Sequence, residues 1–461
     1  MTDTRLPNPG MARCPAPSTR ELLLRDKGGA PEPLLEESYD FQGDHDISYD
    51  AYTSQAYALL EQERLFSRTW QWACREDHIV NTGEYYIYDI GFRSAIVVRT
   101  ADGQIKAYDN FCQHRGTQLK PSASQGRAQQ IRCPFHGWTW NLDGQLTDLP
   151  CRWDFPHVTD EEFALSELRV GTWGGFVFVN FDENAAPLHD YLGVLPRHFA
   201  TWDLADRYVE VHARKRLPCN WKAAMSAFLE AYHVLETHPE GIRTTGDANA
   251  QYDVFGENVT RFIHTVGTKS PHVREEFTEQ ELLDLLLARK FPTATQRPLV
   301  PPGEVARDVY AGFVQNMMSQ RYGRDFSHLT NTETIDSIEY FLFPNAFFFP
   351  GLQLSMCYRF RPDPENPDFC TFDLLIMRPK PIDGPAPRPA KAFDLDVSES
   401  YKLTPGIDQG LAYVYDQDTN NLAAQTRGFK GSKKRAQTLG NYQEIRTRHL
   451  HNMVDRYVSV P

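Results

Sequence analysis

The sequence predicts an α+β protein, in which a small all-β domain precedes a larger domain that combines a sheet with helices. Short apolar runs separated by turn residues follow one another from Glu84 to Phe181. Beyond Pro218, helical and strand-like patterns alternate. The chain has 461 residues, of which 41% are hydrophobic and 12% aromatic, so it is long enough to bury two or three cores.

Composition and charge exclude several classes of protein. The net charge of −13 gives the chain no general attraction for nucleic acid or anionic membranes. No run approaches the ~20 apolar residues of a membrane-spanning helix, and residues 1–19 lack the apolar segment of a secretory signal. The eight cysteines are too scattered for a disulfide framework. We therefore expect a cytoplasmic protein.

The first part of the chain is expected to form an arm, a helix and then a meander of strands. Residues 1–45 are rich in proline, glycine and charge, which indicates an extended arm, and the apolar spacing of residues 51–70 predicts a helix. Alternating apolar runs predict strands at 84–91, 94–100, 105–110 and 173–181, with turns at 102–103 and 141–144. We assign residues 46–165 to this domain and 166–461 to the next.

The second part of the chain contains both helical and strand-like patterns of apolar residues. Alanine content and apolar spacing predict a helix over 220–238, and residues 274–291 predict an amphipathic helix. Strands are expected at 259–267, 338–343, 352–360 and 370–379, and a helical pattern extends from 406 to 458. A sheet with flanking helices follows from this alternation.

Two Cys/His pairs form the first candidate site. Cys112 and His114 are separated by one residue, Cys133 and His136 by two, and eighteen residues lie between the pairs. Two thiolates on one iron and two imidazoles on the other are the ligands of a Rieske-type [2Fe–2S] cluster, which would need each pair on a tight loop. A structural zinc site is the alternative, although zinc sites more usually contain Cys-x2–4-Cys pairs.

Two histidines and a carboxylate form the second candidate site. His233 and His238 lie five residues apart, and Glu230 precedes the first by three. Two histidines and one carboxylate would suit a mononuclear iron, because that set leaves adjacent positions open for O2 and substrate. On a regular helix the two histidines differ by about 140°, so the helix must widen or end between them. The alternative is a hydrogen-bonded histidine pair on a helix surface.

Together these motifs resemble the α subunits of Rieske non-haem iron oxygenases over roughly residues 45–445. The similarity extends along CPFHGWTWNLDGQL (133–146) and NWK…EAYH…HP (220–239). It implies a β-rich Rieske domain with a [2Fe–2S] cluster on Cys112, His114, Cys133 and His136. It also implies a helix-grip-like catalytic domain, in which an antiparallel sheet wraps around a helix.

The resemblance assigns roles in the catalytic domain as well. It makes His233 and His238 ligands of one Fe(II), and Glu230 a bridge to His136 of the neighbouring subunit rather than a ligand. Family members carry an aspartate ligand ten residues before the glycine of an Arg-Gly pair, and Asp418 has this spacing to Gly428. Asp416 is the alternative, and either acid could instead be an exposed helix residue. We prefer Asp418.

The expected function follows from the family. Such an oxygenase uses O2 and electrons from an NAD(P)H-linked reductase, received directly or through a ferredoxin. It would mono- or cis-dihydroxylate, or oxidatively demethylate, a small apolar aromatic or alicyclic compound. The family implies a head-to-tail homotrimer or an α3β3 assembly with a small β subunit. Candidate pocket residues are Met225, Phe228, Leu229, Leu235 and Phe347 or Phe348. The alternative function is a Rieske electron carrier or redox sensor without oxygenase activity.

Overall fold

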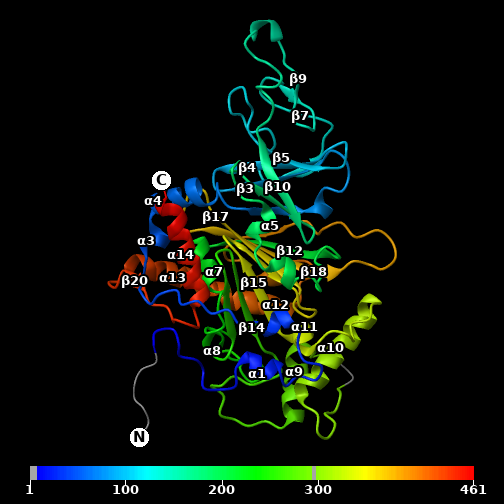
Figure 1. Ribbon diagram of the computed structural model, residues 1–461, viewed down its shortest axis with the longest axis vertical. Helices are drawn as coiled ribbons and strands as arrows, with labels where there is room; N and C mark the ends of the chain where they lie inside the picture. The colour runs from blue at the N-terminus through cyan, green and yellow to red at the C-terminus, as the bar shows by residue number, and fades with distance from the viewer. Residues whose placement is uncertain (1–7, 293–296, 461) are drawn as a thin grey trace.

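The computed structural model describes residues 8–292 and 297–460, which form a narrow upper protrusion on a larger lower body (Figure 1). The protrusion is built on short antiparallel strands, whereas the body combines a large sheet with helices on its faces and edges. The α+β prediction is confirmed.

The protrusion and its base contain two sheets. A seven-stranded sheet has the order β2-β11-β10-β5-β4-β3-β6, and a three-stranded sheet β7-β8-β9 lies beyond it. The strands of the first are β2 (Gln71–Arg75), β3 (Glu84–Ile90), β4 (Arg93–Arg99), β5 (Ile105–Asp109), β6 (Gln125–Arg127), β10 (Glu167–Trp173) and β11 (Phe176–Asn180). Those of the second are β7 (Ile131–Arg132), β8 (Thr139–Trp140) and β9 (Leu146–Asp148). The larger sheet thus has strands on both sides of residue 165, the expected domain boundary.

The side chains of strand β4 alternate between two hydrophobic cores, one on each face of this sheet. Ile96 and Val98 belong to the small core beneath the Cys/His loops. Ala95 and Val97 belong instead to the large core that continues into the body. Because successive side chains of a strand point to opposite faces, one apolar strand serves both cores. The protrusion is therefore anchored to the body by a shared hydrophobic core.

The body is built on an eight-stranded sheet with the order β13-β14-β15-β16-β17-β18-β12-β19. Its strands are β12 (Arg207–Leu217), β13 (Gln251–Phe255), β14 (Val259–His264), β15 (Ser337–Leu342), β16 (Ala346–Phe349), β17 (Met356–Pro362), β18 (Cys370–Pro379) and β19 (Phe393–Leu395). All neighbours are antiparallel except β12 and β19. The antiparallel sheet expected from the family is present.

Helices cover this sheet and extend from its edge. They include α7 (Trp221–Ser226), α9 (Glu279–Lys290), α10 (Ala306–Tyr322), α11 (Asn331–Ile335), α12 (Gln409–Asn420), α13 (Leu422–Gly431) and α14 (Ile445–Ser459). Helix α7 packs on β17 and β18, α14 packs on β13, and α9 to α11 form a separate group beside β15. Shorter helical segments are α5 (Leu188–Tyr191), α6 (Leu195–His198), α8 (Val234–Thr237), η2 (Glu76–His78), η3 (Arg152–Asp154) and η4 (Tyr401–Leu403).

The expected helix over 220–238 is wrong as a continuous element. Helix α7 ends at Ser226 and α8 begins only at Val234. The backbone groups released between them find distant partners: Ala231 N donates to the Tyr252 hydroxyl (2.9 Å), and Arg446 donates to the Leu229 carbonyl (3.3 Å). Tertiary hydrogen bonds therefore replace the helical ones that local propensity favoured.

Two other helical predictions are corrected in detail, while one is confirmed. The segment 51–70 divides into α3 (Asp50–Thr53), α4 (Gln55–Leu60) and η1 (Glu61–Leu65), because Ser54 leaves the helix and caps α4. The helical pattern of 406–458 is interrupted between α13 and α14 by β20 (Ala436–Gln437), which pairs with β1 (Ile47–Ser48). Helix α9 forms within 274–291 as predicted, beginning after the capping box of Thr278 and Glu281.

The N-terminal arm is docked on the body. It contains two short helices, α1 (Thr19–Leu23) and α2 (Glu32–Leu35), with Leu23 and Leu34 fully buried. Arg307 forms an ion pair with Asp26 in the arm (2.7 Å), and Arg261 donates to the Glu36 carbonyl (2.7 Å). Buried guanidinium groups of the body thus take some of their hydrogen-bond acceptors from the arm, which is less extended than its composition suggested.

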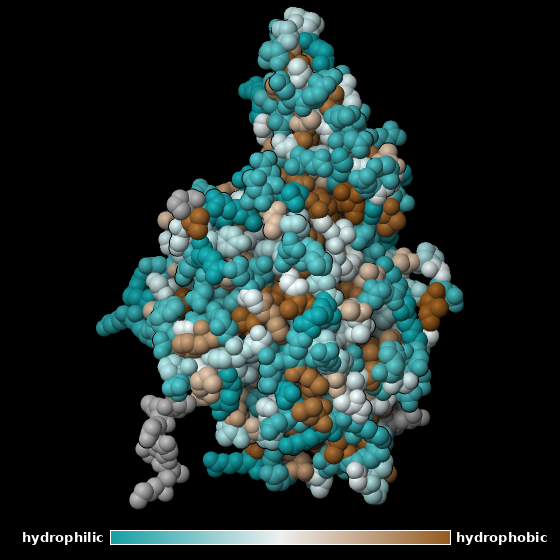
Figure 2. Space-filling view, viewed as in Figure 1, coloured by the Kyte–Doolittle hydropathy of each residue, from teal (hydrophilic) through white to brown (hydrophobic). Residues whose placement is uncertain are grey.

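The visible surface is mostly hydrophilic, with hydrophobic residues in separate small groups (Figure 2). In the described part of the chain, no helix has both the length and the apolar character to cross a bilayer.

Candidate metal centres

The two Cys/His pairs lie on two loops of similar geometry in the protrusion. In the first loop, Cys112 N donates to the Thr117 carbonyl (2.9 Å), and in the second, Cys133 N donates to the Trp138 carbonyl (2.8 Å). The glycine that follows each pair, Gly116 or Gly137, has a positive φ of 71° or 79°. Because this left-handed conformation is strained for other residues, glycine lets both loops turn tightly behind the candidate ligands.

The four side chains separate into an inner thiol pair and an outer imidazole pair. Cys112 and Cys133 are buried, and burial together with the adjoining Cys133 sulfur raises the pKa of the Cys112 thiol. His136 is exposed, and its ring lies 4.7 Å from that of His114 between centroids. His114 stacks on Trp138 with an interplanar angle of 2°. Two sulfurs inside and two imidazoles outside fit a cluster whose irons have different ligands.

These four residues do not converge as ligands of one ion. A single tetrahedral ion requires all its ligand atoms to lie close together. Among the described residues, the group His233, His238 and Asp418 is the only one in which three or more such atoms lie within 4.8 Å of one another. The two loops therefore fit a two-iron cluster better than a structural zinc.

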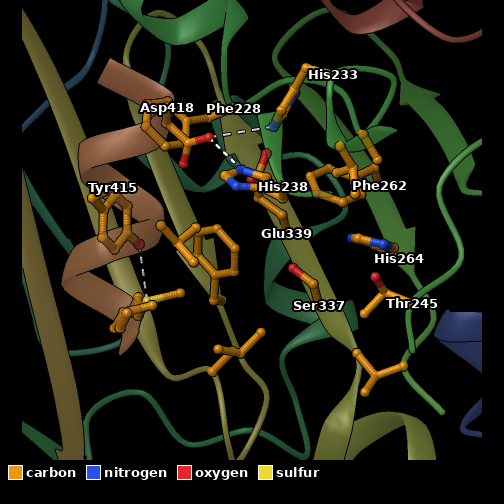
Figure 3. A pocket seen from close by; sticks show the side chains of 18 of the residues that line it. Phe228, His233, His238, Thr245, Phe262, His264, Ser337, Glu339, Tyr415 and Asp418 are labelled. Atoms are coloured by element: carbon orange, nitrogen blue, oxygen red, sulfur yellow. Dashed lines mark hydrogen bonds and ion pairs between the residues drawn. The ribbon is translucent and has the colours of Figure 1, made fainter. Parts of the chain in front are cut away.

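His233, His238 and Asp418 form the second centre, at the meeting point of α8 and α12. Asp418 Oδ1 lies 2.7 Å from His238 Nε2 and 3.5 Å from His233 Nε2. Short helix α8 fills the interval between the histidines, so His233 precedes its first turn and His238 follows its last. The two imidazoles consequently face the same carboxylate although they are five residues apart (Figure 3).

The outer nitrogens of both imidazoles are held by acceptors. His233 Nδ1 donates to Glu230 Oε1 (2.8 Å), and His238 Nδ1 donates to Gln417 Oε1 (3.0 Å). Glu230 also accepts from the backbone N of His233 (2.9 Å), which fixes the turn before α8. This arrangement selects the tautomer whose Nε2 lone pair is free, as metal-binding histidines require.

The electrostatics of this centre favour a positive charge. Burial opposes protonation of His233, but the carboxylates of Glu230 and Asp418 outweigh it and raise the pKa of His233 to about 10. The histidines in turn hold the pKa of Asp418 below its usual range against the effect of burial. A divalent cation between these atoms would supply the positive charge that this centre favours, so the residues fit a metal site.

The structure distinguishes the two candidate aspartates of α12. Asp416 accepts hydrogen bonds from Ser400 Oγ (2.5 Å) and Tyr401 N (3.0 Å), and it caps the turn of η4. Asp418 alone faces the histidines, and its side chain is buried. Neither acid is the exposed helix residue of the alternative reading.

A cavity of about 170 Å³ adjoins the three convergent side chains. Its wall is mainly apolar and includes Phe228, Val234, Phe262, Val266, Ile335 and Phe349. Figure 3 shows His233, His238 and Asp418 on one side of the cavity, with His264, Thr245 and Ser337 on the other. A cavity of ~150 Å³ holds benzene in another protein, so this one suits a molecule of about one ring.

Among the candidate pocket residues, Phe228 lines the cavity. The others do not: Met225, Leu229, Phe347 and Phe348 are fully buried in the cores, and Leu235 lies outside the lining.

Sequence reasoning missed the partners that come from distant elements. Gln417 could have been found from its place beside Asp418. Tyr415 and Tyr358, whose hydroxyls form a hydrogen bond beside the cavity, and Glu339 on β15 carry no motif. Only the fold brings them to the site.

The chain matches two described families. Residues 69–159 match "Rieske [2Fe-2S] domain", and residues 199–460 match "Ring hydroxylating alpha subunit (catalytic domain)".

Individual proteins show the same similarity at lower coverage. The chain is 29% identical over 225 residues to a glycine betaine monooxygenase oxygenase subunit of Pseudomonas aeruginosa, covering 47% of this chain and 51% of that protein. It is 32% identical over 198 residues to the benzene 1,2-dioxygenase subunit alpha of Pseudomonas putida, covering 41% and 44%. The chain thus spans about half the length of the curated relatives it matches.

The fold is also similar to that of a solved structure. The quaternary ammonium Rieske monooxygenase CntA in complex with L-carnitine superposes with a TM-score of 0.60 at 17% identity, over 89% of this chain and 95% of that one. At this identity the similarity establishes the fold alone.

Proposed function

The chain belongs to the family of ring-hydroxylating oxygenase α subunits with a Rieske domain, and we propose that it is the oxygenase component of such an enzyme. In this proposal it uses O2 and electrons from an NAD(P)H-linked reductase to hydroxylate or oxidatively demethylate a small compound with an apolar body. The observation that carries the proposal is the convergence of His233, His238 and Asp418 beside a mainly apolar cavity.

The metal groups would be held by residues that fit them. Cys112, Cys133, His114 and His136 would hold a [2Fe–2S] cluster, and the two histidines with Asp418 would hold one Fe(II). When bound, these groups supply single-electron transfer and O2 activation, the latter because two imidazoles and one carboxylate leave coordination positions open.

The remaining residues orient the ligands and shape the space for substrate. Glu230 and Gln417 hold the two imidazoles through their Nδ1 atoms, which keeps both Nε2 atoms directed at one point. Glu230 is also our candidate for the link to His136 of a neighbouring subunit. Phe228, Phe262 and Phe349 exclude water from the cavity and would place an apolar body beside the metal ligands.

The alternative, a Rieske electron carrier or redox sensor, requires only the two loops of the protrusion. It gives no role to the second centre, whose three side chains are oriented by acceptors on their outer nitrogens and adjoin a cavity. Electron carriers need no such cavity, so this observation favours the oxygenase.

Iron content and oxygen uptake together test the proposal. The oxygenase should contain three irons per chain, a number that follows from one two-iron cluster and one mononuclear site. With a surrogate reductase, a substrate panel should reveal oxygen uptake coupled to a product whose mass has increased by oxygen or, after replacement of a methyl group by hydrogen, decreased by CH2. Two irons per chain and no substrate-dependent oxygen uptake would support the carrier instead.

A further inference from the structure

Two cations lie in the wall of the cavity next to the second metal centre. Arg289 and Lys290 are the last two residues of α9, and both side chains line the cavity although most of its wall is apolar. Both are only partly exposed to solvent. A charged side chain beside an apolar cavity is costly unless an opposite charge accompanies it.

The guanidinium of Arg289 has a prepared position. Its Nη1 donates to Thr244 Oγ1 (3.3 Å). A Cβ at Gly241 would lie only 3.0 Å from both terminal nitrogens, so the absence of a side chain there makes room for the guanidinium. Since Gly241 follows His238 by three residues, the segment that carries a metal ligand also positions Arg289.

All acidic side chains of the cavity wall have basic partners within the protein. Glu230 pairs with His233, Asp418 with His238 (2.7 Å), and Glu339 with Arg446 (2.7 Å). In contrast, the described chain places no carboxylate within salt-bridge distance of Arg289 or Lys290; Glu240 and Asp408 are the acids whose charges reach them, and both are exposed. Residues 293–296, just beyond α9, are Thr, Ala, Thr and Gln and contain no acid.

The pKa of Lys290 is consistent with an uncompensated charge. Burial, assisted by the neighbouring Arg289, lowers it to about 8, and Asp408 compensates only in part. The carbonyl end of α9 favours cations by the helix dipole, which is a sufficient reason for a basic residue there. It does not account for two such residues lining one cavity when no described carboxylate lies within salt-bridge distance of either.

Neutral polar groups lie on the side of the cavity away from the metal ligands. Figure 3 shows His264, Thr245 and Ser337 on this side. His264 Nε2 is buried and has no hydrogen-bond partner in the described part of the chain. Burial lowers the pKa of His264, and the charge of Arg289 adds to this effect. These groups could bind a polar substituent that enters the cavity.

We propose that the substrate is a small carboxylate, whose negative group binds Arg289 and Lys290 while its apolar body lies beside His233, His238 and Asp418. The planar guanidinium suits two hydrogen bonds to one carboxylate, and the ammonium adds a second charge. The inference rests on the proposed oxygenase function, for which it names the class of substrate. The size of the cavity limits the body to about one six-membered ring.

Matched pairs of probes test this inference without turnover. The metal-loaded protein is titrated anaerobically, without reductase, with benzoate against benzamide and with cyclohexanecarboxylate against its carboxamide. Each pair shares its shape and differs in charge. Isothermal titration calorimetry should give carboxylates at least about tenfold tighter binding than their amides, because charge-assisted hydrogen bonds exceed neutral ones.

Four variants test whether Arg289 causes the preference for carboxylates over amides. Arg289→Gln should abolish the difference between acid and amide, whereas Arg289→Lys should keep part of it. Gly241→Ala retains the charge but displaces the guanidinium, so it should weaken carboxylate binding even if Arg289→Gln fails to fold. Arg243→Gln removes an exposed arginine that pairs with Glu275 and should change nothing.

The outcomes for the carboxylate site can be distinguished from those for the proposed oxygenase function. Equal binding of acids and amides, an unchanged preference in Arg289→Gln, or no binding of either carboxylate at millimolar concentration would overturn it. Oxygen uptake with neutral compounds would leave the oxygenase function intact in that case. Conversely, selective carboxylate binding by a protein that never turns over with O2 and reductase would support this site and contradict the oxygenase function.

Discussion

At the scale of single residues, neighbouring side chains on α12 have separate tasks. Asp416 caps the turn at Tyr401, Gln417 accepts from His238 Nδ1, and Asp418 faces both histidines. Because successive helix residues point about 100° apart, three consecutive positions serve three different neighbours.

Removing Asp418 should empty the mononuclear site alone. In Asp418→Ala the two histidines lose the one carboxylate among the described residues that faces both of them, so mononuclear iron and turnover should be lost while the cluster remains. Asp416→Ala is the matched control and should retain iron, because its partners are Ser400 and Tyr401. Metal analysis and the visible spectrum of the cluster measure both. Loss of iron in Asp416→Ala but not in Asp418→Ala would mean that Asp416, and not Asp418, is the ligand.

Gln417 should support iron affinity without being a ligand. Gln417→Leu leaves His238 Nδ1 without its acceptor, so the imidazole can rotate or change tautomer, and iron affinity should fall by about 10–100-fold. Competition with a chelator measures this affinity, and Gln417→Glu, which keeps an acceptor, should restore most of it. Normal affinity in Gln417→Leu would mean that packing alone orients His238.

The candidate site residues could be picked out from the sequence where they belong to a local motif. Cys112 to His136 and Glu230 to His238 are short patterns, and Asp418 was predicted from the spacing that the resembled family shows between an aspartate and an Arg-Gly pair, here Arg427-Gly428. Gln417, Glu339 and Arg289 belong to no pattern, because their role depends on which distant segment the fold brings beside them.

At the scale of elements, a buried ion pair joins η1 to α7, the helix before the candidate metal ligands. The ammonium of Lys222 on α7 and the carboxylate of Glu61 on η1 form this pair, and Trp221 Nε1 donates to the same carboxylate (3.0 Å). Both charged side chains are fully buried, so each depends on the other for its charge.

Breaking this pair should destabilise the body strongly. Lys222→Met leaves the Glu61 carboxylate buried without a counter-charge, which should cost about 3–5 kcal/mol of unfolding free energy. Lys430→Met removes one partner of an exposed pair with Asp368 and should cost at most about 1 kcal/mol. Denaturant unfolding compares the two variants, and similar losses in both would argue against a structural role for the buried pair.

Element type was more predictable than element continuity. Helix α9 and the predicted strands β3, β4, β5, β11, β14, β15, β17 and β18 follow their apolar periodicity. The break between α7 and α8 does not, because it is stabilised by Tyr252 and Arg446, which lie beyond the reach of local patterns. That break is functionally important, since it directs His233 and His238 at one point.

At the scale of the whole molecule, the two metal centres lie in different parts of the chain. Strand β7, which ends just before the second Cys/His loop, lies in the upper protrusion, whereas α8 lies in the lower body (Figure 1). His136 is exposed on the protrusion, and Glu230 lies beside a second cavity that also contacts His233. A ring of subunits could place the exposed loop of one chain against this cavity of the next.

Mixed assemblies should reveal whether electrons cross between subunits. Cys133→Ser should lack the cluster but keep the mononuclear iron, and His233→Ala should lack the iron but keep the cluster. Each alone should be inactive. If subunits form a closed head-to-tail trimer, one of the three interfaces in every mixed trimer pairs an intact cluster with an intact neighbouring iron, so isolated mixed trimers should recover about a third of wild-type product formation. Different affinity tags on the two variants isolate the mixed trimers, and native mass spectrometry verifies their composition.

Mixing the purified variants without exchange of subunits should restore nothing. Verified mixed trimers that form no product would mean that each chain must reduce its own iron.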